Sequence, residues 1–168
     1  MKKVKRWIDL VLLTIGSILI IFLVVAAIWQ VFTRFVLEDP SIVTQEILRF
    51  SLIWVALIGA AYAFGQDEHL SLTFLRDKIT GQAHKRLRWF IDMLVIVFAL
   101  FVFVIGGYNI SQATMAELSP ILNMPMGLVY GILPICGTII IFYQLIHISE
   151  RREIERTGSF EKGEHTWM

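Results

Sequence analysis

Four ionisable side chains fall inside long apolar stretches of this sequence, where a charge is costly and is therefore a candidate for function. Glu46 and Arg49 are three residues apart, so on a helix they share a face and can neutralise each other. Arg34 is expected to reach the same membrane level, and Asp92 follows Arg88 by one helical turn. Arg34, Glu46 and Arg49 thus form a candidate charge cluster. It either fixes structure or meets a partner, or its members only anchor helix ends at the membrane surface.

Patterns that support catalysis or cofactor binding are missing from the sequence. The histidines are scattered over loops and helix ends, whereas a haem-binding bundle needs facing pairs at bilayer depth; they are His69, His84, His147 and His165. There is no glycine-rich phosphate loop, nucleophile elbow or deep pair of carboxylates. We therefore expect no catalytic, substrate-binding or metal-binding residues, no cofactor and no enzymatic activity.

The composition indicates that lipid is the solvent of this chain. Of 168 residues, 57% are hydrophobic, and the mean hydropathy of +0.70 exceeds that of a soluble domain. The net charge of +1 and the short basic clusters argue against a nucleic-acid partner. The apolar run near the N-terminus continues past the ~7–15 residues of a secretory signal, so we interpret it as a retained helix. The single cysteine, Cys136, excludes an intramolecular disulfide.

Four apolar windows are long enough to cross a bilayer, which takes about 20 residues as a helix. The predicted fold is an all-α membrane protein with one four-helix transmembrane domain in residues 1–150, followed by a charged cytoplasmic tail, 151–168, which we expect to be disordered beyond Gly158. The predicted helices are continuous, without the paired Gly/Pro breaks of a carrier's solute site, and cover about residues 10–36, 46–64, 89–110 and 126–148.

The basic residues predict the orientation of these helices. Lysine and arginine gather before the first helix, in residues 65–88 and after the fourth helix, and are absent from 37–45 and 111–125. By the positive-inside rule, both termini are cytoplasmic. Within the cytoplasmic loop, residues 70–79 have apolar positions at helical spacing and predict either an amphipathic helix lying in the interface or a plain loop.

Small residues and one tryptophan predict close helix packing. Gly127 and Gly131 form a Gly-x-x-x-Gly pair, and Gly59 and Ala63 form a similar small-residue pair. Such pairs pack helices within one chain or between two copies. Trp54 lies in the middle of the second apolar window, where an indole N–H needs a partner. We therefore expect it to bond within the protein or to face another protein.

Three stretches of the sequence carry a family resemblance. Residues 29–35 read Trp-Gln-Val-Phe-Thr-Arg-Phe; residues 44–70 include Gln-Glu-Ile-Leu-Arg-Phe and Gly-Ala-Ala-Tyr; the third stretch spans residues 119–137 and contains Pro120, Pro125, Tyr130 and Pro134. Together with Trp29, Trp54 and Gly59, these positions resemble the small membrane subunit, DctQ type, of tripartite ATP-independent periplasmic (TRAP) transporters. The chain departs from the family where two acids often stand, at Gln45 and Glu46, and where a basic residue and a glycine often precede the histidine.

The resemblance implies a non-catalytic scaffold in the bacterial inner membrane. Such a subunit pairs with a large multi-helix membrane subunit and works with a periplasmic solute-binding protein. The implied activity is sodium-driven uptake of an organic acid, sialic acid or a C4-dicarboxylate. The alternatives are a small self-assembling exporter and a structural membrane protein with no transport partner. An exporter would need an essential carboxylate deep in a helix, and Glu46 lies near the end of one.

Overall fold

The computed structural model describes residues 2–66 and 82–164, with side chains described for residues 4–66 and 89–149. This part of the chain is helical except for its turns and one isolated β-bridge. Four of its helical segments are long and apolar enough to span a membrane, which confirms the predicted fold class. The predicted interfacial helix at residues 70–79 lies outside the described residues. In chain order the elements are α1 (Lys2–Phe35), α2 (Ile42–Gly65), α4 (Gln82–Phe98), the π-helix η1 (Ala99–Gly106), α5 (Gly107–Ala113), α6 (Met126–Tyr130) and α7 (Ile132–Glu164).

The second span begins four residues before its predicted start. Ser41 is the N-cap of α2, and its hydroxyl oxygen accepts a hydrogen bond from the backbone N–H of Thr44 at 3.4 Å. Serine satisfies one of the orphan donors of a first helical turn, so the helix starts where a cap is available and not where the apolar run becomes dense. As a result, Glu46 lies within the first turns of α2 and not at its first residue.

The fourth span is interrupted, although the sequence predicted a continuous helix. α6 ends at Tyr130, Gly131 forms a one-residue turn, and α7 begins at Ile132. Pro134 explains the break, because a proline has no N–H to bond the carbonyl four residues earlier and its ring crowds that carbonyl. α7 then runs to Glu164 and so continues through Gly158, where we expected order to end. The many Glu and Arg residues of this segment are good helix formers.

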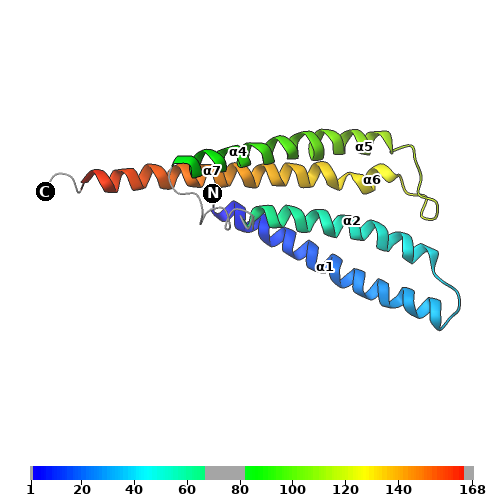
Figure 1. Ribbon diagram of the computed structural model, residues 1–168. Coiled ribbons are helices and arrows are strands. Elements are labelled where there is room, and N and C mark those ends of the chain that lie inside the picture. The colour runs from blue at the N-terminus through cyan, green and yellow to red at the C-terminus, as the bar shows by residue number, and fades with distance from the viewer. Residues whose placement is uncertain (1, 67–81, 165–168) are drawn as a thin grey trace.

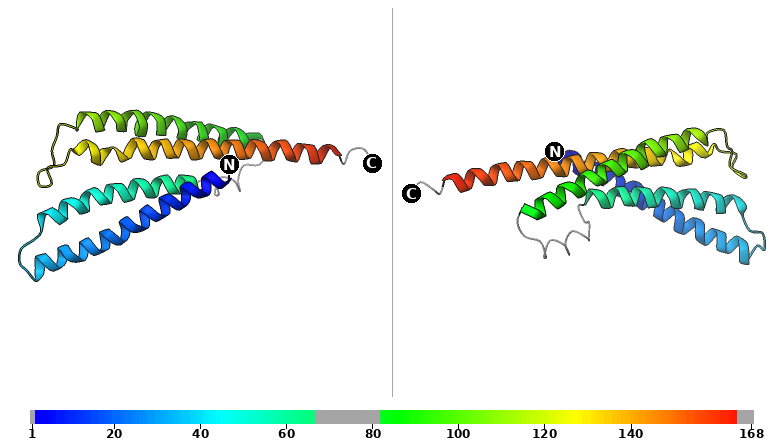
Figure 2. Two further views of the ribbon diagram at one scale, coloured as in Figure 1. Left: turned by 180° about the vertical axis from the view of Figure 1, so that it is seen from behind. Right: turned by 45° about the horizontal axis from the view of Figure 1, so that its top comes forward.

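The spans form an open row. α1 packs on α2, α2 packs on α7, and α7 packs on η1 and α4. Figures 1 and 2 show that the hairpin of α1 and α2 approaches the hairpin formed by α4, η1, α5, α6 and α7 most closely near the N-terminus and diverges from it toward the opposite end. That opposite end, which holds residues 36–41 and 114–125, is called the loop end below. Because the two hairpins diverge toward the loop end, broad faces of their helices remain uncovered there.

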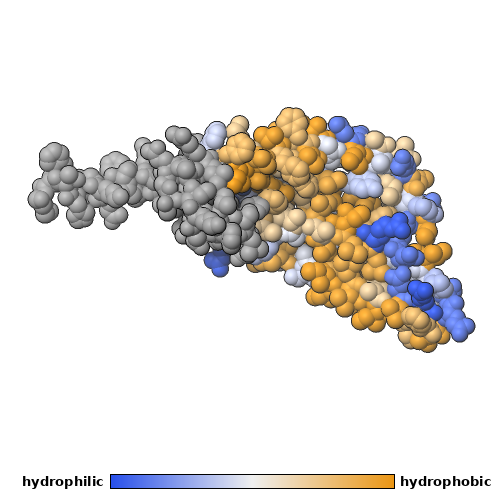
Figure 3. All heavy atoms as spheres, viewed as in Figure 1, coloured by the Kyte–Doolittle hydropathy of each residue, from blue (hydrophilic) through white to orange (hydrophobic). Residues whose placement is uncertain are grey.

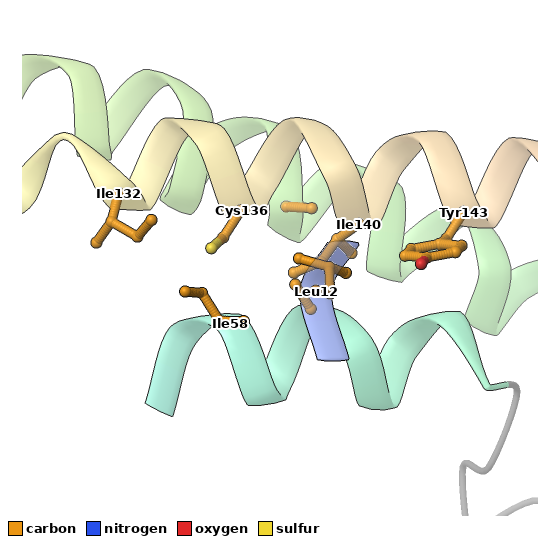
Figure 4. Packing of buried hydrophobic residues seen from close by; sticks show 8 residues of the cluster. Leu12, Ile58, Ile132, Cys136, Ile140 and Tyr143 are labelled. Carbon is orange, nitrogen blue, oxygen red and sulfur yellow. The ribbon is translucent and has the colours of Figure 1, made fainter. Parts of the chain in front are cut away.

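The core lies along the inner face of α7. Figure 4 shows Ile132, Cys136, Ile140 and Tyr143 on α7 facing Ile58 of α2 and Leu12 of α1. In the span that contains α7, 39% of the 18 most apolar consecutive residues are buried. The corresponding share is 11% in α2 and 6% in α1. The surface of the described spans is accordingly apolar, and the polar side chains on the face in Figure 3 gather toward the loop end. An apolar belt of this kind matches a lipid environment.

Candidate functional site

Glu46 connects the two helical hairpins at the loop end. The residue is 7% exposed, and its carboxyl group accepts two hydrogen bonds from the loop that precedes α6. The hydroxyl of Ser119 donates to Oε1, and the backbone N–H of Leu122 donates to Oε2 at 2.9 Å. A buried carboxyl group needs such donors. Glu46 therefore holds residues 119–122 against the start of α2.

The loop is folded so that both donors face Glu46. Ser119 N–H bonds the carbonyl of Met124 at 2.9 Å, and Asn123 N–H bonds the carbonyl of Ser119 at 3.1 Å. Asn123 has a positive φ of 51°, a conformation that asparagine tolerates better than most residues. Leu118 pairs with Pro125 in an isolated antiparallel bridge. The turn is therefore closed by backbone bonds of its own in addition to its bonds with Glu46.

The two arginines of the predicted cluster lie apart from this contact. Arg34 and Arg49 are both exposed. The guanidinium of Arg34 lies 5.8 Å from the centre of the neighbouring Phe35 ring. Among the described residues, no ion pair joins Glu46 to either arginine. The structure thus separates the cluster into one buried carboxyl group with hydroxyl and amide donors, and two exposed cations.

Trp54 makes the second connection between the hairpins. Its indole N–H donates to the carbonyl of Val129 at 3.1 Å, just before the break between α6 and α7. Between this bond and the Glu46 contact lies an apolar cleft of about 490 Å³. It is lined by Leu19 of α1, Phe50, Ser51 and Trp54 of α2, and Met124, Leu128 and Val129 at the start of the fourth span.

Glycines bring the third and fourth spans together. A Cβ on Gly127 would lie 2.3 Å from the carbonyl oxygen of Ser111, and one on Gly137 would lie 2.6 Å from Cβ of Phe103 in η1. The hydroxyl of Ser111 also donates to the carbonyl of Gly127 at 2.7 Å. Gly131 is less crowded, with its nearest atom at 3.3 Å, and Gly59 has nothing within 4 Å. Gly127 therefore lies in a helix contact within the chain, whereas Gly59 faces open space.

The remaining predicted positions divide between the loop end and the break in the fourth span. Trp29 is 52% exposed and stacks on Phe32. Pro120 is exposed beside Ser119, and Pro125 is the N-cap position of α6. Tyr130 and Pro134 are half-buried on the two sides of the break. The prolines and Tyr130 thus lie at turns and helix ends, whereas Trp29 lies within α1.

A third set of polar contacts, which the sequence analysis missed, gathers on α7 near the N-terminal end of the molecule. Tyr143 donates to the carboxyl group of Asp9 on α1, and Gln144 donates to Asp92 on α4 at 2.6 Å. His147 Nε2 lies 3.0 Å from the carbonyl oxygen of Gly65 and is the donor, because a carbonyl can only accept. Tyr143, Gln144 and His147 lie close together in an apolar stretch of the sequence, and this spacing could have predicted polar contacts there.

In the described part of the chain, these polar contacts join helix to helix or helix to loop. They connect α2 to the loop before α6, α2 to α6, and α7 to the other three spans. No group of three potential metal ligands occurs among the described residues. Fold and site together define a multi-pass helical membrane protein whose buried polar groups hold the helices in place.

Comparison with known proteins identifies the family of this membrane protein. Residues 23–153 match the family described as "Tripartite ATP-independent periplasmic transporters, DctQ component". The chain belongs to this family, which confirms the resemblance seen in the sequence. It is 29% identical, over 70% of its length and 67% of the relative's, to the sialic acid TRAP transporter small permease protein SiaQ of Vibrio cholerae. It is 28% identical, over 66% of its length and 68% of the relative's, to a putative TRAP transporter small permease protein of Haemophilus influenzae.

One further relative has a different size. The chain is 21% identical, over 83% of its own length, to the sialic acid TRAP transporter permease protein SiaT of Haemophilus influenzae. The match covers only 21% of that protein. Most of the SiaT polypeptide therefore has no counterpart in this chain.

Proposed function

We propose that this chain is the non-catalytic scaffold subunit of a TRAP transporter and works together with a large multi-helix membrane subunit. The observation that carries the proposal is the match to one fifth of the SiaT permease. A protein that contains a segment like this chain and a much larger remainder suggests that the two parts act together. When they are separate polypeptides, the larger part has to be supplied by a partner.

The open row of spans supports the same assignment. Only 6% of the residues in the most apolar stretch of α1 and 11% of those in α2 are buried, so these two spans leave wide helix faces that a partner can cover. Within the described residues, the polar contacts above join helices, and the 490 Å³ cleft is lined almost wholly by apolar side chains. Solute and sodium sites therefore belong to the partner.

We further propose the setting in which the subunit acts. It lies in the bacterial inner membrane with both termini in the cytoplasm, because every basic cluster falls on one side. The complete system imports an organic acid, with sialic acid favoured over a C4-dicarboxylate by two relatives named for sialic acid. A periplasmic solute-binding protein delivers the solute, and a sodium gradient drives uptake.

Reconstitution tests the proposal. Liposomes with a sodium gradient and the cognate solute-binding protein should take up labelled sialic acid when they contain this chain and its large subunit. Liposomes with this chain alone should show only background uptake. Equal uptake by this chain alone would show that it is a carrier, and failure of the chain to co-purify with the large subunit would contradict the partnership.

A further inference from the structure

α2 has an uncovered face although it lies between two other spans. Six exposed residues alternate four and three positions apart, so they form one stripe along the helix; they are Gln45, Arg49, Leu52, Ala56, Gly59 and Ala63. We call this stripe the α2 open face. The buried residues of α2, among them Glu46, Ile58 and Ala61, follow a separate stripe that faces the rest of the chain.

The composition of the α2 open face differs from that of the other exposed faces. The exposed residues of α1 are mostly bulky and apolar, such as Ile18, Ile21 and Val25, and α7 exposes Ile135 and Phe142. Bulky apolar side chains suit contact with lipid tails. Small residues instead allow another helix to approach closely in a membrane. A Cβ on Gly59 would meet nothing within 4 Å, so the space over it is open in this chain.

Arg49 provides an independent argument. It lies in the apolar span on the same stripe as Gly59, it is exposed, and no ion pair within the described residues includes it. It is seven residues, or about 10 Å at 1.5 Å per residue, from the first residue of α2. A charged side chain at this depth is costly unless it faces a partner or water. The α2 open face therefore suits an occupant that supplies negative charge near Arg49.

The same charge argues against a second copy of this chain as the occupant. Two copies in one membrane with the same orientation, related by a two-fold axis along this face, would place Arg49 opposite Arg49. Two cations at close range in a medium of low dielectric repel strongly. A partner of different sequence can place a carboxyl group there.

We propose that the α2 open face is the seam on which a transmembrane helix of the large subunit packs, with an acidic side chain opposite Arg49 and an apolar side chain over Gly59. This inference rests on the proposed function and identifies the part of this chain that binds the partner.

Leucine substitutions on the two kinds of exposed face test the seam. In the complex with the large subunit, Gly59→Leu and Ala63→Leu should reduce the recovered large subunit roughly tenfold, because overfilling a close helix contact forces the helices apart. Ala27→Leu, the same change on the exposed surface of α1, should leave recovery unchanged. Because the space over Gly59 is open within this chain, Gly59→Leu should not disturb the isolated subunit. Parental recovery with both α2 variants would overturn the inference.

Charge variants and crosslinking test the kind of occupant. Arg49→Glu should reduce recovery of the large subunit to a similar degree, whereas Arg49→Lys should largely retain it. Ala56→Cys should form a crosslink with a cysteine in the large subunit and no crosslink between two copies of this chain. Crosslinked dimers of this chain, or full recovery with Arg49→Glu, would overturn the assignment. If the parent chain itself failed to bind the large subunit, the proposed function would be wrong and this inference with it.

Discussion

Glu46 on α2 accepts a hydrogen bond from the hydroxyl of Ser119, which lies 73 residues later in the chain. The contact fastens the loop before α6 to the neighbouring hairpin at the end where the two hairpins diverge. It also places the one buried carboxyl group of the predicted charge cluster in a structural role within the subunit. The exposed arginines of that cluster remain available for a partner.

Replacing Glu46 should destabilise the isolated subunit. Glu46→Ala leaves the Ser119 hydroxyl and the Leu122 N–H without their acceptor, and a buried unsatisfied donor costs about 1–3 kcal/mol. Thermal unfolding in detergent should show a lower Tm for Glu46→Ala than for the parent. Glu38→Ala, at an exposed position in the turn after α1, is the matched control and should change the Tm little. Equal melting of all three proteins would contradict a structural role for Glu46.

Removing the indole N–H of Trp54 should have a smaller effect. Trp54→Phe keeps a ring at the edge of the apolar cleft but loses the hydrogen bond to the carbonyl of Val129, which is worth about 0.5–1.5 kcal/mol. Denaturant unfolding in detergent measures this change. Trp29→Phe is the control, since Trp29 is exposed and stacks on Phe32. Equal losses in the two variants would show that the Val129 bond contributes nothing specific.

Two glycine variants should have opposite effects. Gly127→Ala places a methyl group 2.3 Å from the carbonyl oxygen of Ser111, and overpacking of this kind costs about 1–3 kcal/mol. Gly59→Ala meets open space and should stabilise the helix by up to about 1 kcal/mol, because glycine is a poor helix former. The measurement is the free energy of unfolding of each isolated variant, compared with that of the parent. A stabilising effect of Gly127→Ala would show that the close approach at Gly127 is unimportant, and a destabilising effect of Gly59→Ala would contradict the open space over Gly59.

The contact between Gln144 and Asp92 should contribute to stability at the other end of the molecule. Gln144→Leu removes a donor from the buried carboxyl group of Asp92 and should cost about 1–3 kcal/mol. Gln112→Leu makes the same chemical change at an exposed position of α5 and should cost much less. Unfolding midpoints of the two variants in one detergent provide the measurement. A larger loss for Gln112→Leu would contradict the role given to Gln144.

The orientation can be tested with single cysteines in intact cells. Cysteines replacing Asp39 and Glu117 should react with a membrane-impermeant thiol reagent, and cysteines replacing Lys78 and Lys162 should not, because the basic segments remain in the cytoplasm. Cys136 is buried and gives little background labelling. Labelling at Lys78 without labelling at Glu117 would reverse the proposed topology.

Much of the fold could be read from the sequence because lipid forces each span to satisfy its own backbone. A run of about 20 apolar residues must form a helix there, so hydropathy located all four spans. Helix ends were harder to locate, because capping by Ser41 and the missing N–H of Pro134 act on single residues within an apolar pattern. The need of Trp54 for a hydrogen-bond partner followed from its depth, although the partner itself did not.

By itself, the amino-acid sequence determined that this is a helical membrane protein with four spans, because local hydrophobicity and backbone hydrogen bonding are sufficient for that. Only the tertiary structure decided which helices are neighbours. Lipid tails are as apolar as leucine, so hydrophobicity does not select one helix pair over another. The pairing depends on close contacts at Gly127 and Gly137 and on bonds such as Tyr143 to Asp9. For the same reason, Glu46 was correctly singled out as an unusual residue, while its partners, Ser119 and Leu122, became evident only when the loop was seen folded against α2.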